Sequence, residues 1–184
     1  LYDYAEDAES EEDAIEDYPV TLFLSQHGYF KKITPQSLRM SGEQKFKEDD
    51  ALSMSVESSN AAELMFFTDK AQVYKTRASD FADGKASQLG DYLPAKLGMA
   101  EGESVMGMVL PGDYSGYMIF FFENGKAAKV ELSAYKTTSN RRRLTGAYSD
   151  KSPLKALLHL KEDREIAVYS TAVSYTPSPS PRDS

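Results

Sequence analysis

The sequence predicts an all-β repeat protein built from propeller-like blades. An apolar strand, a polar turn and a second strand occur in this order three times, in residues 20–38, 63–81 and 116–135. A lysine occupies the same position of the second strand in each copy, as Lys32, Lys75 and Lys129. The copies are separated by loops of unequal length, and repeats of this period are typical of blades or of linear arrays.

The composition limits the class of protein. The chain has 184 residues, of which 41% are hydrophobic and 27% are charged, so it can bury a moderate core. It contains no apolar run long enough for a transmembrane helix, and its acidic start is unlike a signal peptide. The absence of cysteine excludes disulfides and thiolate metal sites, and it fits a cytoplasmic location.

The negative charge is concentrated at the start of the chain. The formal net charge is −8, but nine of the 29 acidic residues lie in residues 1–17, which contain no basic residue. The remainder is therefore close to neutral, and the net charge does not argue against binding to nucleic acid. Residues 1–17 have too little apolar content to fold alone, and we interpret them as an acidic linker.

The first repeat begins with an expected strand over residues 20–25, followed by a turn at Gln26-His27-Gly28. Pro35 interrupts the end of the second strand and favours an edge position or a break there. Residues 40–50 form an expected polar loop. Residues 52–56 alternate between apolar and polar side chains and predict a further strand.

The second repeat contains the longest insertion. Residues 82–103 are rich in glycine, and we expect a loop with at most one short strand. Residues 104–110 are expected to supply the closing strand.

The third repeat opens with the most apolar strand of the sequence, residues 117–122, and its loop over residues 136–152 contains Arg141-Arg142-Arg143. A strand is expected at residues 154–160. A fourth repeat starts at residues 166–170 but lacks the turn glycine, because Val173 stands at that position. The predicted organisation is a linker at residues 1–17, a partial array at 18–172 and a disordered Pro/Ser-rich tail at 173–184, with blades at about 18–60, 61–115 and 116–162 and the start of a fourth at 163–172.

These repeats resemble blades of the C-terminal β-pinwheel of the type IIA topoisomerase A subunit, which occurs in bacterial gyrase and topoisomerase IV. In that family an apolar strand leads through a polar turn to a strand with an aromatic residue or valine before a lysine. The segments LFLSQHGYFKKI, LMFFTDKAQVYKT and IFFFENGKAAKV fit this pattern, and the loop and strand GDYLPAKLGMAEGESVMGMV also resemble a blade of the family. The resemblance covers about residues 20–170, or three blades and the start of a fourth.

The resemblance implies a non-catalytic module that binds and bends double-stranded DNA without reading its sequence, so that duplex DNA is positioned for ATP-dependent strand passage. The implied partners are duplex DNA, the A-subunit dimer and the ATPase B-type subunit, with no membrane, in the cytoplasm near the nucleoid. The glycine-rich basic box that supports DNA wrapping in gyrase is missing from residues 39–47, and residues 141–146 come nearest to it in composition. The choice between a gyrase-like and a topoisomerase IV-like subunit therefore stays open. An alternative function is a protein-interaction scaffold without DNA binding.

Basic side chains at blade edges and in loops are the candidates for phosphate contact. The predicted DNA-binding residues are Lys31, Lys32, Lys45, Lys47, Lys75, Lys129, Arg141, Arg142 and Arg143, and a wider set adds Lys70, Arg77 and Lys126. For the three repeated lysines a second interpretation has equal weight, namely protection of a strand edge against pairing with another chain. The arginine run favours phosphate contact more strongly, because three adjacent guanidinium groups repel one another and folding rarely requires them in a loop.

No enzyme chemistry is predicted for this segment. The two histidines, His27 and His159, have no second metal ligand at a suitable spacing, and no phosphate-binding loop or nucleophile motif occurs. We therefore expect no cofactor, no metal and no catalytic residue. The resemblance places the DNA-cleaving tyrosine in a separate breakage–reunion domain, and the tyrosines of this chain are expected to lie in the core or on sheet faces.

Overall fold

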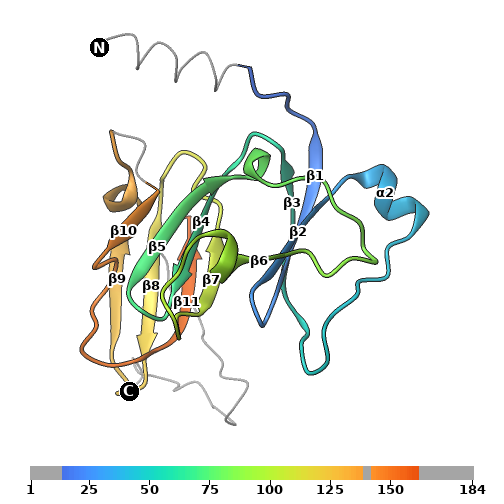
Figure 1. Cartoon of the computed structure of the whole chain (residues 1–184). Helices are drawn as coiled ribbons and strands as arrows, with labels where there is room; N and C mark the ends of the chain where they lie inside the picture. The colour runs from blue at the N-terminus through green and yellow to red at the C-terminus, as the bar shows by residue number, and fades with distance from the viewer. Residues whose placement is uncertain (1–13, 139–141, 162–184) are drawn as a thin grey trace, which may run out of the picture.

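Three antiparallel sheets make up the computed structural model, which describes residues 14–138 and 142–161 (Figure 1). The first sheet has the strand order β3 (Leu52–Ser59), β1 (Pro19–Ser25), β2 (Tyr29–Ile33) and β6 (Asp91–Tyr92). The second has the order β10 (Arg143–Thr145), β5 (Gln72–Arg77), β4 (Glu63–Thr68) and β7 (Val105–Val109). The third has the order β11 (Leu154–Leu160), β8 (Tyr117–Phe122) and β9 (Ala127–Glu131). The short helices are α2 (Pro35–Met40), α3 (Leu93–Lys96), η1 (Ala78–Asp80) and η2 (Leu132–Tyr135).

Strands are exchanged between consecutive repeats. After the hairpin β4–β5 of the second repeat, the chain returns to the first sheet, where β6 pairs with β2. After the hairpin β8–β9 of the third repeat, β10 pairs in the same way with β5 of the second sheet. Each of the first two sheets is thus completed by a strand from the following repeat.

The sheets stack face to face, and the second sheet is covered on both sides. Leu64 and Phe66 of β4 pack in a cluster with Leu22 and Leu24 of β1, whereas Met65 and Phe67 pack in a second cluster with the third sheet. This explains why β4 is an uninterrupted apolar run, since a strand with two buried faces does not alternate. The strands β1 and β8 alternate in burial, as expected for sheets at the two ends of the stack.

The three hairpin turns share a backbone conformation that favours glycine. Gly28 and Gly125 have φ angles of 94° and 86°, and Ala71 occupies the equivalent place with φ of 56°. A non-glycine residue is strained in this left-handed region, and Ala71 is held there from outside its own hairpin. Its N–H donates to the Tyr148 hydroxyl at 3.2 Å, and its carbonyl accepts from the N–H of Ala147 at 2.8 Å.

Most expected strands are observed, and the differences lie in the connections. Pro35 does end the second strand, but it also begins α2, where Thr34 caps the helix by accepting from the N–H of Ser37. The loop expected over residues 136–152 contains β10, and the insertion over residues 82–103 contains α3 as well as β6. The fourth repeat expected from residue 163 onward and the tail at 173–184 lie outside the described residues.

The end of the predicted acidic linker contacts the sheets. The carbonyl of Glu16 accepts from the Asn60 side-chain amide at 2.8 Å, and the Asp17 carboxylate accepts from the N–H of Ala61 at 2.9 Å. Residues 16 and 17 therefore belong to the folded part of the chain.

Candidate nucleic-acid interface

Two of the repeated lysines are buried and bind segments of their own chain. Lys32 is 3% exposed, and its ammonium donates to Asn60 Oδ1 at 2.6 Å and lies 3.3 Å from Asp83 Oδ1. Lys75 is 9% exposed and donates to the Tyr135 carbonyl at 3.0 Å. In this conformation both ammonium groups are held by partners within the chain.

The adjacent Lys31 is also buried, with 5% of its surface exposed. Its ammonium donates to the carbonyls of Ala86 at 3.1 Å and Gln88 at 2.9 Å. Burial lowers the pKa of this ammonium, because the charged form is removed from water. Lys31 thus fastens residues 86–88, which lead into the exchanged strand β6, to β2.

The other predicted residues that the structure describes are exposed. Lys45 and Lys47 lie on the loop that follows α2, where the N–H of Lys45 donates to the Ala86 carbonyl. Lys129 lies on β9 with its ammonium 4.2 Å from the centre of the Tyr117 ring. Arg142 and Arg143 lie at β10, and the Arg142 side chain is 70% exposed, 3.9 Å from Asp80. Arg141 lies outside the described residues.

Several exposed bases lie along equivalent edges of the three sheets, while others, such as Lys70, Lys96 and Lys151, lie elsewhere. We call these the exchange edges, meaning the edge beside β6 in the first sheet, β10 in the second and β9 in the third. Because the sheets repeat the same topology and stack face to face, their exchange edges follow one another along the stack. The exposed bases on or beside them are Lys45, Lys47, Lys85, Arg142, Arg143, Lys126 and Lys129.

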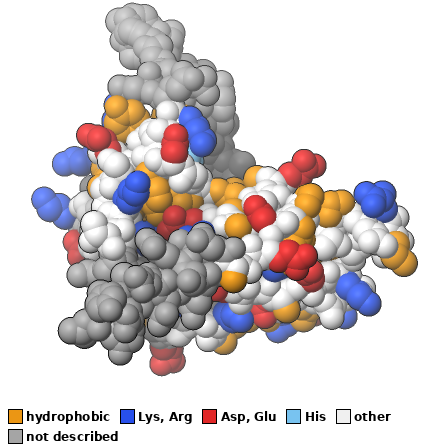
Figure 2. Space-filling model, turned by 90° about the horizontal axis from the view of Figure 1, so that it is seen from above, with side chains coloured by type: hydrophobic (Ala, Val, Ile, Leu, Met, Phe, Trp, Pro, Cys, Tyr) orange, Lys and Arg blue, Asp and Glu red, His pale blue; other side chains and the backbone are white. Residues whose placement is uncertain are grey.

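The charge along these edges is mixed. Asp80 and Asp83 are exposed beside the bases of the second and first sheets, and Glu131 is exposed two residues after Lys129. In the view of Figure 2, Lys and Arg side chains also stand apart from one another at the margin of the molecule, with acidic side chains between them. Such a surface can make spaced contacts to phosphates, but it does not form a continuous basic groove.

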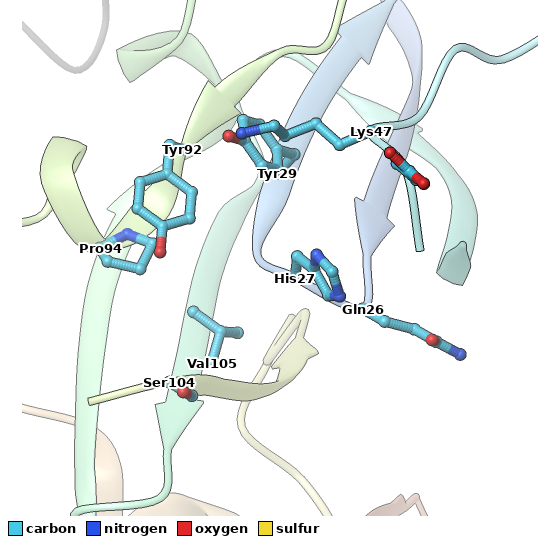
Figure 3. A pocket seen from close by; sticks show the side chains of 9 residues that line it. Gln26, His27, Tyr29, Lys47, Tyr92, Pro94, Ser104 and Val105 are labelled. Atoms are coloured by element: carbon cyan, nitrogen blue, oxygen red, sulfur yellow. The ribbon is translucent and has the colours of Figure 1, made fainter. Parts of the chain in front are cut away.

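Two features of this region were not predicted from the sequence. They are the exposed Lys85 and a hollow at the seam where the first two sheets meet. The hollow has a volume of about 600 Å³, and its lining includes His27, Tyr29, Lys47 and Tyr92 (Figure 3). Tyr92 and Lys85 lie in the long insertion, and only the pairing of β6 with β2 brings that insertion to the first sheet. No local sequence signal marks such an exchange.

Among the described residues, no three acidic or histidine side chains are arranged to hold a metal ion. The helices in the same part of the chain are too short and too polar to cross a membrane.

Comparison with known proteins relates these features to one family. The A subunit of DNA gyrase from Mycoplasma pneumoniae is 26% identical over 180 residues, which cover 94% of this chain and 21% of that protein. The A subunit of DNA topoisomerase 4 from Staphylococcus epidermidis is 29% identical over 155 residues, covering 81% of this chain and 19% of that protein. This chain thus spans about a fifth of the length of the curated relatives it matches. No protein-family profile matches the chain.

The decisive structural comparison is with a crystal structure of the C-terminal domain of DNA topoisomerase IV. It matches with a TM-score of 0.71 and 21% identity, over 80% of this chain and 47% of that domain. The chain has the β-pinwheel fold. In sequence and in fold it resembles the C-terminal region of type IIA topoisomerase A subunits, which confirms the predicted resemblance and the all-β class. The three sheets correspond to pinwheel blades, and strand exchange links the first blade to the second and the second to the third.

Proposed function

We propose that this chain is the DNA-binding and DNA-bending part of a bacterial type IIA topoisomerase A subunit. It holds duplex DNA along its exchange edges, so that the duplex is positioned for ATP-dependent strand passage by the complete enzyme. The chain contributes no catalytic group of its own. It acts in the cytoplasm beside the nucleoid, together with the A-subunit dimer and the ATPase subunit.

The observation that carries this proposal is the recurrence of exposed bases on equivalent edges of successive blades. Each edge supplies at least two bases, namely Lys45 and Lys47, then Arg142 and Arg143, then Lys126 and Lys129. A duplex that follows these edges makes contacts at intervals, and we expect it to bend so that it reaches the edges of all three sheets. Contacts from exposed loops and strand edges to phosphates bind without reading base sequence.

The mixed charge of the edges sets the expected strength of binding. The acids beside the bases reduce the favourable potential, so the contact is weaker than that of a continuous basic groove, and because it touches fewer phosphates its affinity falls less steeply with salt. The chain is therefore expected to bend DNA around the blades without wrapping it tightly.

The test is a salt titration of binding to two unrelated duplexes, combined with energy transfer between dyes at the two duplex ends. The double variant Arg142→Ala with Arg143→Ala should weaken binding to both duplexes equally. Its slope of log affinity against log salt should fall by about 0.9 for each phosphate that the variant no longer touches. The matched control is Lys151→Ala with Lys155→Ala, which removes the same charge near β11, on the opposite edge of the third sheet.

Increased end-to-end energy transfer on binding would support bending. If the wild-type chain binds neither duplex at low salt, the proposal fails and a protein-interaction scaffold is favoured. If the slope falls by the same amount in both double variants, the bound DNA is not restricted to the exchange edges.

A further inference from the structure

The hollow at the seam between the first two blades has the features of a binding site for a planar ring. It opens between the β1–β2 turn, the β6–α3 segment and the start of β7 (Figure 3). The Tyr92 side chain borders it and is 45% exposed, which makes it one of the most exposed large apolar residues described. Tyr29 lies behind Tyr92 with 5.0 Å between the ring centroids, so the exposed ring has a fixed support.

The equivalent place at the next seam is filled by an aromatic ring of the chain itself. The N–H of Leu93 donates to the Gly28 carbonyl, and the N–H of Ala147 donates to the Ala71 carbonyl in the same way. Pro94 in the first seam therefore corresponds to Tyr148 in the second. Tyr148 is buried, stacks on Phe120 at 4.7 Å and donates from its hydroxyl to the Thr68 carbonyl. At the first seam Pro94 has no such ring or hydroxyl, and open volume remains beside it.

The polar groups around this volume fit a nucleotide. Lys47 reaches over Tyr29 with its ammonium 5.9 Å from the ring centre, and it supplies a positive charge at the mouth of the hollow. His27 lies across the hollow from Tyr92 and Pro94 and offers hydrogen-bonding nitrogens, whereas the Gln26 side chain points away from them (Figure 3). Glu48 also lines the hollow, and its carboxylate can accept from an exocyclic amino group of a base.

We propose that this hollow binds an unpaired nucleobase of single-stranded DNA, stacked on Tyr92 with its phosphate beside Lys47. Aromatic side chains combined with lysine are the usual means of holding single strands, because every base has a face on which to stack. The proposal goes beyond contact with duplex DNA along the exchange edges, because stacking on Tyr92 is an interaction that a fully paired duplex does not make, although Lys47 serves both contacts. It gives the chain a separate preference for DNA with an unpaired end or gap.

The experiment compares a blunt duplex with the same duplex carrying a ten-nucleotide overhang of mixed dA and dC, both labelled with a fluorophore at the far end. Anisotropy titrations use the whole chain as wild type, Tyr92→Ala and Tyr92→Phe. The wild type should bind the overhang probe about five-fold or more tighter than the blunt probe. Tyr92→Ala should lose this gain while keeping its affinity for the blunt probe, and Tyr92→Phe should retain the gain.

Unchanged affinity of Tyr92→Ala for the blunt duplex also serves as a check that the variant is folded. Equal binding of both probes by the wild type would overturn the proposal, and so would a gain that persists in Tyr92→Ala. If the overhang probe binds and the blunt duplex does not, the duplex proposal fails while this one stands.

Discussion

Glu103 is a buried carboxylate that joins separate parts of the second blade. It is 4% exposed and accepts from the Thr68 hydroxyl at 2.6 Å and from the Tyr74 hydroxyl at 3.1 Å. It also accepts from the side-chain amide of Gln72 and the N–H of Ala100. The carboxylate therefore fixes the end of the long insertion against β4 and β5, at the point where β7 begins.

Replacing Glu103 with alanine should destabilise the fold by about 3 kcal/mol, because several buried donors lose their acceptor together. The measurement is urea unfolding followed by circular dichroism. Glu101→Ala is the control, since Glu101 is exposed two residues away, and it should change the free energy of unfolding by less than about 0.5 kcal/mol. Similar losses of stability in the two variants would show that the hydrogen bonds of Glu103 do not stabilise the fold.

At the scale of elements, the repeated lysine fastens the strand-exchange connection. Lys32 lies against Asp83, in the segment that returns from the second repeat. Lys75 contacts Tyr135 and Thr137, in the segment that returns from the third. Lys129 occupies the same position on β9, where the described residues contain no exchanged strand, and there it is exposed.

This difference predicts unequal effects on stability for chemically identical changes. Lys75→Met should lower the free energy of unfolding by about 2 kcal/mol, since it removes charge-assisted hydrogen bonds at a buried site. Lys129→Met should cost less than about 1 kcal/mol, the scale of an exposed cation–π contact. Thermal and urea unfolding of both variants provide the comparison. Equal costs would mean that Lys75 does not fasten the exchanged segment.

The hairpins could be predicted from the sequence because their signals are local. Apolar runs such as residues 117–122 and turns such as Glu123-Asn124-Gly125 specify a hairpin within a few residues. The pairing of β6 and β10 with the preceding sheet could not be predicted, since each is two or three residues long and pairs with a distant strand. For the same reason, the spacing of the repeated lysines could not predict that Lys32 and Lys75 are buried under exchanged segments. The exposure of Arg142 and Arg143 could be expected, because adjacent guanidinium groups repel one another and favour solvent.

At the scale of the whole molecule, the two ends of the stack differ. Two equivalent positions in each of the first two sheets face the sheet that follows. In the first sheet they are Leu22 and Leu24, and in the second they are Met65 and Phe67. All four side chains are at most 2% exposed. In the third sheet, Ile119 and Phe121 hold these positions and are only partly buried. The third sheet therefore exposes part of an apolar face that is equivalent to the buried faces of the first two sheets. An apolar face does not attract phosphates, so DNA contacts of the third sheet are expected from its exchange edge.

The acidic N-terminal segment adds a long-range electrostatic effect to this arrangement. Residues 1–13 contain seven acids and no base, and they are joined to the first blade through the contacts of residues 16 and 17. A polyanion tethered to the first blade can compete with DNA for the lysines and arginines of the exchange edges. Deleting residues 1–13 should therefore strengthen duplex binding at low salt, and the gain should fade toward 0.15 M salt, where the screening length is about 8 Å.

The measurement is duplex affinity of the whole chain and of the deleted chain across a range of salt concentrations. Stopping the deletion before residue 14 matters, because Glu16 and Asp17 bind Asn60 and Ala61, and their removal would disturb the fold as well as the charge. A second variant keeps the length and replaces the seven acids with their amides, and it should show the same gain if charge is the cause. A gain in the deletion alone would indicate steric blocking of the edges. Unchanged affinity in both variants at low salt would place the segment away from the path of the DNA.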